Sequence, residues 1–82
     1  MRFLVEWQEL VYDNFDKLKV VHNKPLFEIQ TNSLERGREI AETIVNKIII
    51  GKQAVRQSRD ILIAKVTALI DEAGIRHQLP ER

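Results

Sequence analysis

The chain has 82 residues, no cysteine and a net charge of +1, with 44% hydrophobic and 30% charged residues. This length allows one domain, the lack of cysteine excludes disulfides and thiolate metal sites, and the composition is that of a globular chain rather than a disordered one. A domain this short buries only roughly 60% of the surface that its unfolded chain exposes, so we expect a second copy to complete it.

The first segment, residues 2–18, fits either a helix or a strand. A helix gathers the apolar residues on one side and most charged residues in a band on the other. A strand is interrupted by three consecutive apolar residues, Leu10, Val11 and Tyr12. The helix accounts for more of the residues. We therefore expect an N-terminal helix, with a strand at the very start, residues 2–8, as the alternative.

Two short segments rich in β-branched and aromatic residues follow, 18–21 and 26–30, on either side of an Asn- and Pro-containing turn at 22–25. This pattern is typical of a β-hairpin. Pro25 stands at the start of the second strand, where the loss of one hydrogen-bond donor is tolerated. Because a two-stranded hairpin alone is barely stable in water, it must pack on helices or pair with another chain.

The second half of the chain contains two apolar blocks that are compatible with helices, 33–50 and 60–73. Each block has apolar residues at helical spacing, which predicts a stripe along one face. Asn32 is a suitable N-cap for the first block, and its neighbours Thr31 and Ser33 are alternatives. The two stripes would bury each other if the helices packed side by side.

A polar stretch separates these two blocks. Gly51 follows the first block and suits the position just after a helix end, and Ser58 is a possible N-cap for the second block. Gly74 suits the end of the second helix in the same way. The sequence therefore favours two antiparallel helices. One long helix broken near Gly51 is the alternative, because the apolar stripe keeps its phase across the polar stretch.

These segments together predict a small α+β domain over residues 1–75: an N-terminal helix, a β-hairpin and two antiparallel helices, completed by dimerisation. Residues 76–82 have no pattern, and we expect them to fray. The sequence shows no signal peptide and no apolar run near the ~20 residues that cross a bilayer. We therefore expect a cytoplasmic protein without a membrane partner.

The sequence offers little chemistry, because a catalytic or metal site needs several convergent groups. Of the two histidines, His22 lies in a turn and His77 in the tail, and both are expected to be solvated. The serines Ser33 and Ser58 stand where helix caps are expected, with no neighbouring base. We therefore expect no enzymatic activity, no metal site, no cofactor and no small-molecule substrate.

The polar stretch at 51–59 carries three basic residues, Lys52, Arg56 and Arg59, and no acid. In a helix these side chains would lie within about 60° of one another, where they could contact an acidic protein surface or a phosphate backbone. No aromatic residue is interleaved, which disfavours stacking on single-stranded nucleic acid. The plainest interpretation is a solvated connector, and these three residues are the candidate charged contact surface.

A high apolar content in a short chain without catalytic motifs indicates an apolar contact surface. The sequence therefore predicts a small non-enzymatic protein-interaction or regulatory module that forms a homodimer and binds a protein partner. The alternative is a nucleic-acid-binding regulator that uses the basic stretch 52–59. A second alternative is a structural protein whose copies build a larger assembly.

Overall fold

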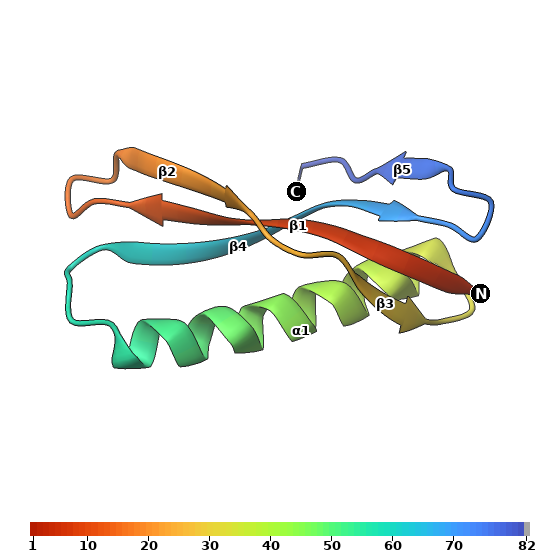
Figure 1. Ribbon diagram of the computed structural model, residues 1–82, viewed down its shortest axis with the longest axis horizontal. Helices are drawn as coiled ribbons and strands as arrows, with labels where there is room; N and C mark the ends of the chain where they lie inside the picture. The colour runs from red at the N-terminus through yellow and green to blue at the C-terminus, as the bar shows by residue number, and fades with distance from the viewer. Residues whose placement is uncertain (82) are drawn as a thin grey trace.

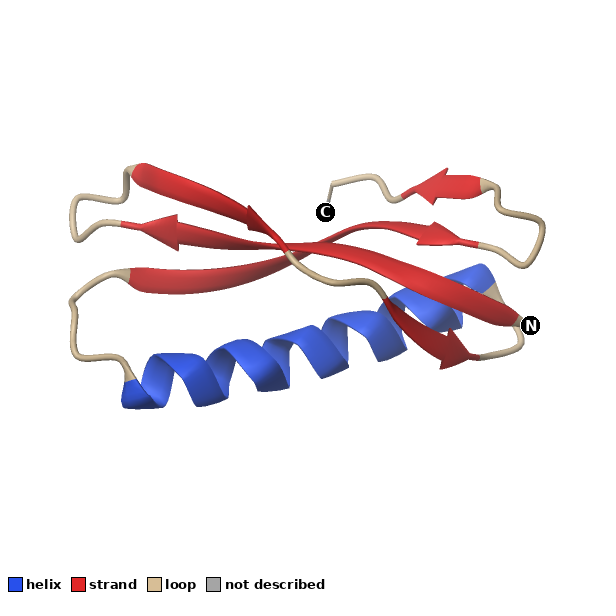
Figure 2. Ribbon diagram, in the orientation of Figure 1, coloured by secondary structure: helices blue, strands red, loops and turns tan. Residues whose placement is uncertain are grey.

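The computed structural model describes residues 1–81 and shows a small α+β fold, with one helix against a five-stranded antiparallel sheet (Figures 1 and 2). In chain order the elements are β1 (Arg2–Tyr12), β2 (Leu18–Asn23), β3 (Phe27–Gln30), α1 (Leu34–Val55), β4 (Ile61–Ile70) and β5 (Arg76–Gln78). The predicted arrangement of an N-terminal helix, a hairpin and two further helices is wrong, because strands replace two of the three helices.

The strand β1 lies at the centre of the sheet. It pairs with β2 through residues 8–12 and with β3 through residues 2–5 on one side, and with β4 on the other. The predicted hairpin is therefore wrong in its pairing: both strand segments exist, but each pairs with β1. The connection between β2 and β3 also stays on β1, since the Lys24 N–H donates to the Trp7 carbonyl at 3.1 Å and the Trp7 indole donates to the Pro25 carbonyl at 3.2 Å.

The first segment is a strand rather than the predicted helix, and its burial follows a two-residue period. Its odd-numbered side chains from position 3 onward are buried on the helix side: Phe3, Val5, Trp7, Glu9 and Val11. On the opposite face, Leu4, Leu10 and Tyr12 are also apolar. Because apolar residues lie on both faces at 10–12, the alternation of hydrophobicity at the start of the strand is lost there, and the sequence pattern was misleading.

The predicted helix at 60–73 is the strand β4, and the reason is similar. Leu62 and Val66 are buried on the helix side, whereas Ile61 and Ile63 lie on the other face. The pairing with β1 also contains a β-bulge at Thr67, which shifts the alternation by one residue. Gly74, expected at a helix end, instead has a φ of 82° in the turn between β4 and β5.

The helix α1 runs without interruption past Gly51, so the predicted break there is wrong. Ser33, one of the three candidate caps, is the N-cap, and its hydroxyl accepts a hydrogen bond from the Arg36 N–H at 3.1 Å. Every fourth residue along the helix is buried against the sheet: Gly37, Ala41, Val45 and Ile49. This stripe is narrow, which leaves most of the helix surface in solvent.

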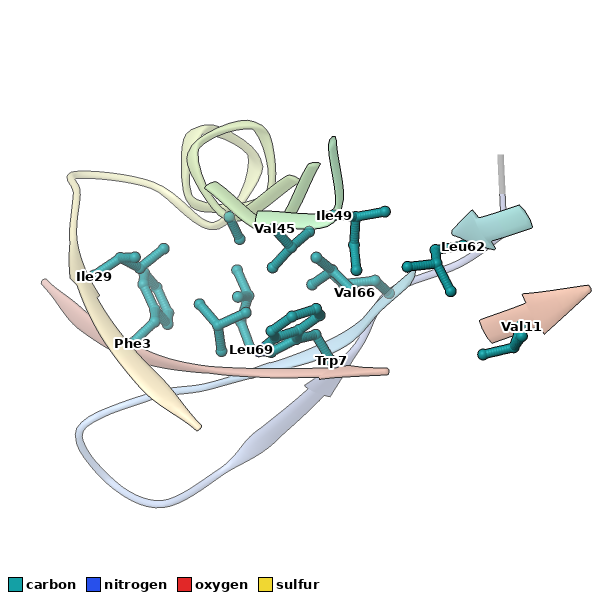
Figure 3. Packing of buried hydrophobic residues seen from close by; sticks show 12 residues of the cluster. Phe3, Trp7, Val11, Ile29, Val45, Ile49, Leu62, Val66 and Leu69 are labelled. Atoms are coloured by element: carbon teal, nitrogen blue, oxygen red, sulfur yellow. The ribbon is translucent and has the colours of Figure 1, made fainter. Parts of the chain in front are cut away.

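The core lies between α1 and the strands β1, β3 and β4 (Figure 3). Its largest fully buried side chains are Phe3, Val5, Val45 and Leu69. The segment 76–82 was expected to fray; within it, Arg76–Gln78 pairs with β4 as β5 and Leu79 is buried against the core, while Arg82 lies outside the described residues.

Gly51→Ala is expected to stabilise the protein by about 0.5–1 kcal/mol, because alanine favours a helix interior and nothing lies within 4 Å of the place of its Cβ. At Gly37, a Cβ would lie 3.1 Å from Leu69 Cδ1 and 3.2 Å from Thr31 Cγ2. Gly37→Val is therefore expected to destabilise by about 1–3 kcal/mol through overpacking. Urea denaturation measures both, and a destabilising Gly51→Ala would contradict a continuous α1.

Candidate interaction surface

The face of the sheet that α1 does not cover carries apolar side chains from three adjacent strands. The register of the sheet places Leu10 between Val21 and Ile63, and Tyr12 between Leu18 and Ile61. We call these residues the open-face cluster: Leu10, Tyr12, Leu18, Val21, Ile61 and Ile63. Its four aliphatic members on β2 and β4 are between 43% and 51% exposed. Where one face of an antiparallel sheet is exposed to water, the side chains on that face are normally polar.

The neighbouring part of the same face is polar, and its charges are paired within the chain. The Arg76 guanidinium donates to both carboxylate oxygens of Glu6, at 3.1 and 2.6 Å, and the Thr67 hydroxyl also donates to this carboxylate. The hydrogen bonds from Arg76 and Thr67 hold the pKa of Glu6 below its usual value. Lys65 Nζ lies 2.5 Å from Glu81 Oε1. This region therefore presents balanced charge to a partner.

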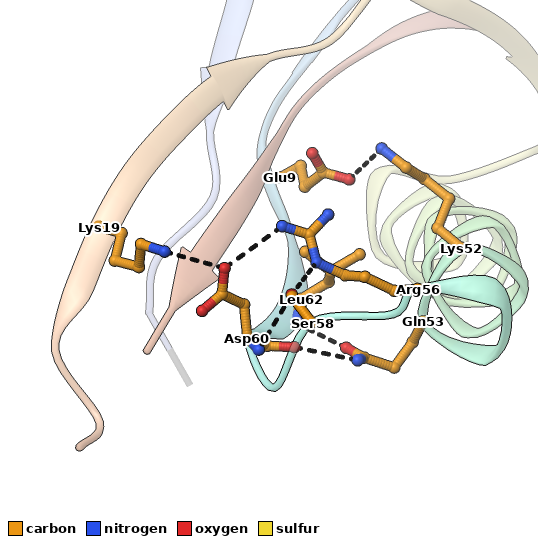
Figure 4. Close-up of polar contacts among 8 residues, drawn as sticks. All are labelled: Glu9, Lys19, Lys52, Gln53, Arg56, Ser58, Asp60 and Leu62. Atoms are coloured by element: carbon orange, nitrogen blue, oxygen red, sulfur yellow. Dashed lines mark hydrogen bonds and ion pairs between the residues drawn. The ribbon is translucent and has the colours of Figure 1, made fainter. Parts of the chain in front are cut away.

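On the other side of the sheet, Lys52 is paired with a buried carboxylate. It projects from the last turns of α1 and donates to Glu9 of β1, whose side chain lies within the core layer (Figure 4). Burial raises the pKa of Glu9, but the hydrogen bond and charge of Lys52, with smaller effects from Lys24 and His22, bring the pKa below its usual value. Lys52 therefore joins the helix to the sheet.

Arg56 and Arg59 do not continue a helical stripe from Lys52, because α1 ends at Val55 and Arg56 is its C-cap. Arg56 Nε donates to Ser58 Oγ at 3.0 Å, and Arg56 Nη2 lies 3.4 Å from Asp60 Oδ2. Arg59 is exposed and forms no hydrogen bond or ion pair with any other residue in the described part of the chain. The three candidate residues are thus brought to one end of the molecule without forming one surface.

Asp60 is the acid that organises this end of the molecule. Lys19 Nζ of β2 lies 2.9 Å from Asp60 Oδ2, on the opposite side from Arg56 (Figure 4). The hydrogen bond from Lys19 is the main reason that the pKa of Asp60 lies below its usual value, and Arg56 adds to it. The basic stretch is therefore neutralised in part by two acids of the chain, Glu9 of β1 and Asp60 just before β4.

Gln53, also near the end of α1, bonds to the backbone of β4. Its Nε2 donates to the Asp60 carbonyl at 3.0 Å, and its Oε1 accepts from the Leu62 N–H at 2.7 Å (Figure 4). A residue in a strand parallel to β4 would make the same two hydrogen bonds through its backbone N–H and C=O groups. The Gln53 carboxamide therefore occupies one backbone position at the outer edge of β4.

The histidines lie apart from each other. His77 Nε2 lies 2.8 Å from Asp71 Oδ2, and His22 stands opposite Glu9 in the pairing of β1 and β2. Among residues 1–81, no three His, Cys, Asp or Glu side chains are grouped so that they could hold a metal ion. Within the same range, no helix is both long enough and apolar enough to span a bilayer.

Sequence reasoning missed the open-face cluster. A usable signal was present in two runs of three apolar residues, 10–12 and 61–63, each with β-branched or aromatic members. In a strand such a run must place apolar side chains on both faces, so it indicates a sheet that needs a cover on each side.

A comparison with protein-family models, with curated proteins and with solved structures found no match for this chain.

Proposed function

We propose that this chain is a small non-enzymatic protein-interaction module that self-associates through the open-face cluster. The observation that carries the proposal is the position of four half-exposed aliphatic side chains beside Leu10 and Tyr12, on a face that no other element among residues 1–81 covers. A sheet with two apolar faces needs a layer on each side. Here α1 supplies one layer only.

The strength of this association follows from the exposed apolar surface. Burying a whole Val, Leu or Ile side chain stabilises by about 1.5–3 kcal/mol. The exposed halves of Leu18, Val21, Ile61 and Ile63 therefore contribute roughly 3–6 kcal/mol for each copy. Association itself costs at least about 4 kcal/mol. We therefore expect reversible, concentration-dependent dimers rather than an obligate complex.

The balanced charge of the open face favours a second copy as the partner. Glu6 is paired with Arg76 and Lys65 with Glu81, so two copies can approach without repulsion between like charges. Two sheets that pack face to face form a sandwich in which each covers the apolar side of the other. The four charged side chains in these two pairs therefore offer no unmatched charge to a strongly charged partner.

Ile63→Glu is expected to shift the protein to the monomer, because it places a charge at the centre of the open-face cluster. Ile50→Glu is the matched control, since Ile50 is 68% exposed on α1, away from this face. Sedimentation equilibrium over a wide concentration range measures the dissociation constant of each variant. We expect at least a tenfold weakening for Ile63→Glu and no change for Ile50→Glu. A wild-type protein that stays monomeric throughout would overturn the proposal.

The proposal does not extend to nucleic acid. Lys52 and Arg56 both pair with acids of this chain, and Arg59 alone is without such a contact among residues 1–81. A protein that tracks a phosphate backbone needs several available cations. The basic stretch therefore supports a structural role at the end of α1 better than a binding role.

A further inference from the structure

The outer edge of β4 is only partly covered. On its inner side β4 pairs with β1 along residues 61–70, whereas on its outer side β5 pairs only with residues 68–70. In the described part of the chain, no strand pairs with the outer side of residues 61–66. Such an edge is a template for a further strand, unless side chains protect it.

Two hydrogen bonds show which backbone groups point outward along this edge. The Trp7 carbonyl accepts from Lys24 on the β2 side of β1, so the alternate residues of β1, Gln8 and Leu10, direct their backbone groups toward β4. Their partners are the odd-numbered residues of β4. The backbone N–H and C=O groups of the even-numbered residues of β4 therefore point outward, in agreement with the Leu62 N–H that donates to Gln53. The backbone groups of Ala64 and Val66 point outward for the same reason.

The tail of the chain occupies the same edge just beyond this point. The Leu79 N–H donates to the Thr67 carbonyl at 3.0 Å, and the Pro80 carbonyl accepts from Arg38 Nη2 at 2.8 Å. Proline has no N–H, so this ladder cannot continue through Pro80 to the next carbonyl of β4. The tail shows that a segment in extended conformation fits against this edge, and among residues 1–81 no backbone hydrogen bond joins the tail to Ala64 or Val66.

A groove of about 230 Å³ adjoins the uncovered edge. Among the residues that line it are Val45 and Asn46 of α1, Ala64 and Val66 of β4, and Leu79 of the tail. Its volume lies below the roughly 300–1,000 Å³ of small-molecule sites. The groove has the size and the largely apolar wall that one side chain of a docked strand requires.

We propose that the outer edge of β4, between Gln53 and Pro80, binds an extended segment of a partner protein. The segment adds to the sheet through the N–H and C=O groups of Ala64 and Val66, and it places an apolar side chain in the groove beside Val45. Main-chain hydrogen bonds provide affinity in this mode of recognition, and the pocket for alternate side chains provides specificity. The groove also touches Leu10 and Ile63 of the open-face cluster, but the added strand binds the backbone edge of β4 rather than the open face, and the inference goes beyond the proposed self-association.

A second copy of this chain is a poor occupant of the edge. An antiparallel register that joins Ala64 to Val66 of the second copy sets the two Lys65 side chains opposite each other, which is unfavourable unless each keeps its ion pair with Glu81. A register centred on Ala64 needs the Leu62 N–H, which already donates to Gln53. Pairing of this edge with the same edge of a second copy is thus disfavoured, and the edge is open to another strand.

Amide hydrogen exchange on the free protein tests the first step. The amides of Ala64 and Val66 are expected to exchange at least tenfold faster than those of Ile63 and Lys65, which bond to β1. Equal protection of all four amides would show that the edge is already closed, and it would overturn the proposal. The measurement needs no ligand and no variant.

A phage-displayed library of random nonapeptides, selected on the immobilised protein, tests the second step. We expect enriched peptides with apolar residues at alternate positions. Binding should weaken at least tenfold with Ala64→Pro, which removes an outward N–H at an edge position, and should be kept by Ile50→Glu, which lies on α1 outside the groove. Should Ala64→Pro fail to fold, N-methylation of alternate peptide amides removes the same hydrogen bonds from the ligand side.

The failure of this proposal is distinguishable from the failure of self-association. Val21→Glu, which places a charge in the open-face cluster on β2 and outside the groove, is expected to dissociate the dimer and to leave the affinity of the selected peptides within about twofold of the wild type. An empty selection would overturn the strand-addition proposal, as would peptides whose binding ignores both Ala64→Pro and N-methylation. Neither result would bear on the sedimentation experiment.

Discussion

Lys52→Met is expected to destabilise the protein by roughly 2–4 kcal/mol at neutral pH, because it leaves the Glu9 carboxylate buried without its main partner. Glu9 is only 4% exposed, whereas the Lys52 side chain is 42% exposed, which reduces the cost below that of a fully buried pair. Methionine keeps the aliphatic length and the helix propensity of lysine. Chemical denaturation of the variant measures the loss.

Lys47→Met is the matched control, since Lys47 is exposed on the same helix and its side chain makes no hydrogen bond or ion pair with any of residues 1–81. It should change the free energy of unfolding by less than about 0.5 kcal/mol. Replacing both members of the pair, as Glu9→Leu with Lys52→Met, should recover most of the stability. Equal effects of the Lys47 and Lys52 variants would contradict the structural role of the pair.

The pH dependence of the same variant has a sign that can be checked. In the wild type the pKa of Glu9 is lowered in the folded state, so the pair contributes stability above the usual pKa of a glutamate. This contribution is lost as the pH falls through the lowered value. Without Lys52, burial dominates and raises the pKa of Glu9. The variant should then become more stable relative to the wild type as the pH falls from neutral, and parallel pH profiles would contradict this account.

Leu69→Ala is expected to destabilise by roughly 3–5 kcal/mol, because Leu69 is fully buried and its removal leaves a cavity between α1 and the sheet. A loss of this size is a large part of the roughly 5–15 kcal/mol that stabilises a whole domain. Thermal and urea denaturation should both show a markedly lower midpoint, or an unfolded chain at room temperature.

Ile63→Ala lies on the same strand and serves as the comparison, since Ile63 is 45% exposed on the opposite face. Measured at a protein concentration at which the wild type is monomeric, it should cost less than about 1.5 kcal/mol. Its main effect should be a weaker self-association. If Ile63→Ala cost as much as Leu69→Ala in the monomer, the division of β4 into a covered and an open face would be wrong.

The sequence was sufficient where local chemistry decides the structure. The segments 18–21 and 26–30 are β-branched and aromatic, and both contain strands. The helix that starts after Ser33 was predicted from its cap and its apolar spacing. Gly51 was wrongly predicted to end the helix. A single glycine in a helix costs only ~1 kcal/mol, and the hydrogen bonds of Lys52 and Gln53 beyond it stabilise the continued helix by more than this cost.

The sequence was insufficient where tertiary contacts decide. Residues 13–17 were included in a helix, yet they form the turn between β1 and β2. There, Asp13 Oδ1 accepts from the Phe15 and Lys17 N–H groups at 2.8 and 3.0 Å, and Asp16 has a φ of 60°. Asp and Asn residues at such spacing are turn signals. The apolar residues on the outer face of β1 also fit a helical spacing, and in the prediction this fit outweighed the turn signals.

The candidate basic residues show the same limit. Lys52, Arg56 and Arg59 were correctly seen as a local concentration of charge. Their partners could not be seen, because Glu9 is 43 residues away from Lys52 in the chain and meets it only when α1 packs on β1. The pairing of charges across elements depends on the fold, and the fold was predicted incorrectly.

The central claim is that the sheet has one face covered by α1 and one face that a second copy covers. Methyl NMR spectra over a concentration series test it directly. The methyl signals of Leu10, Leu18, Val21, Ile61 and Ile63 should shift together with increasing concentration, and those of the exposed Ile50 and Val55 should not. Signals that stay constant at every concentration, or that shift only at Ile50 and Val55, would contradict the claim.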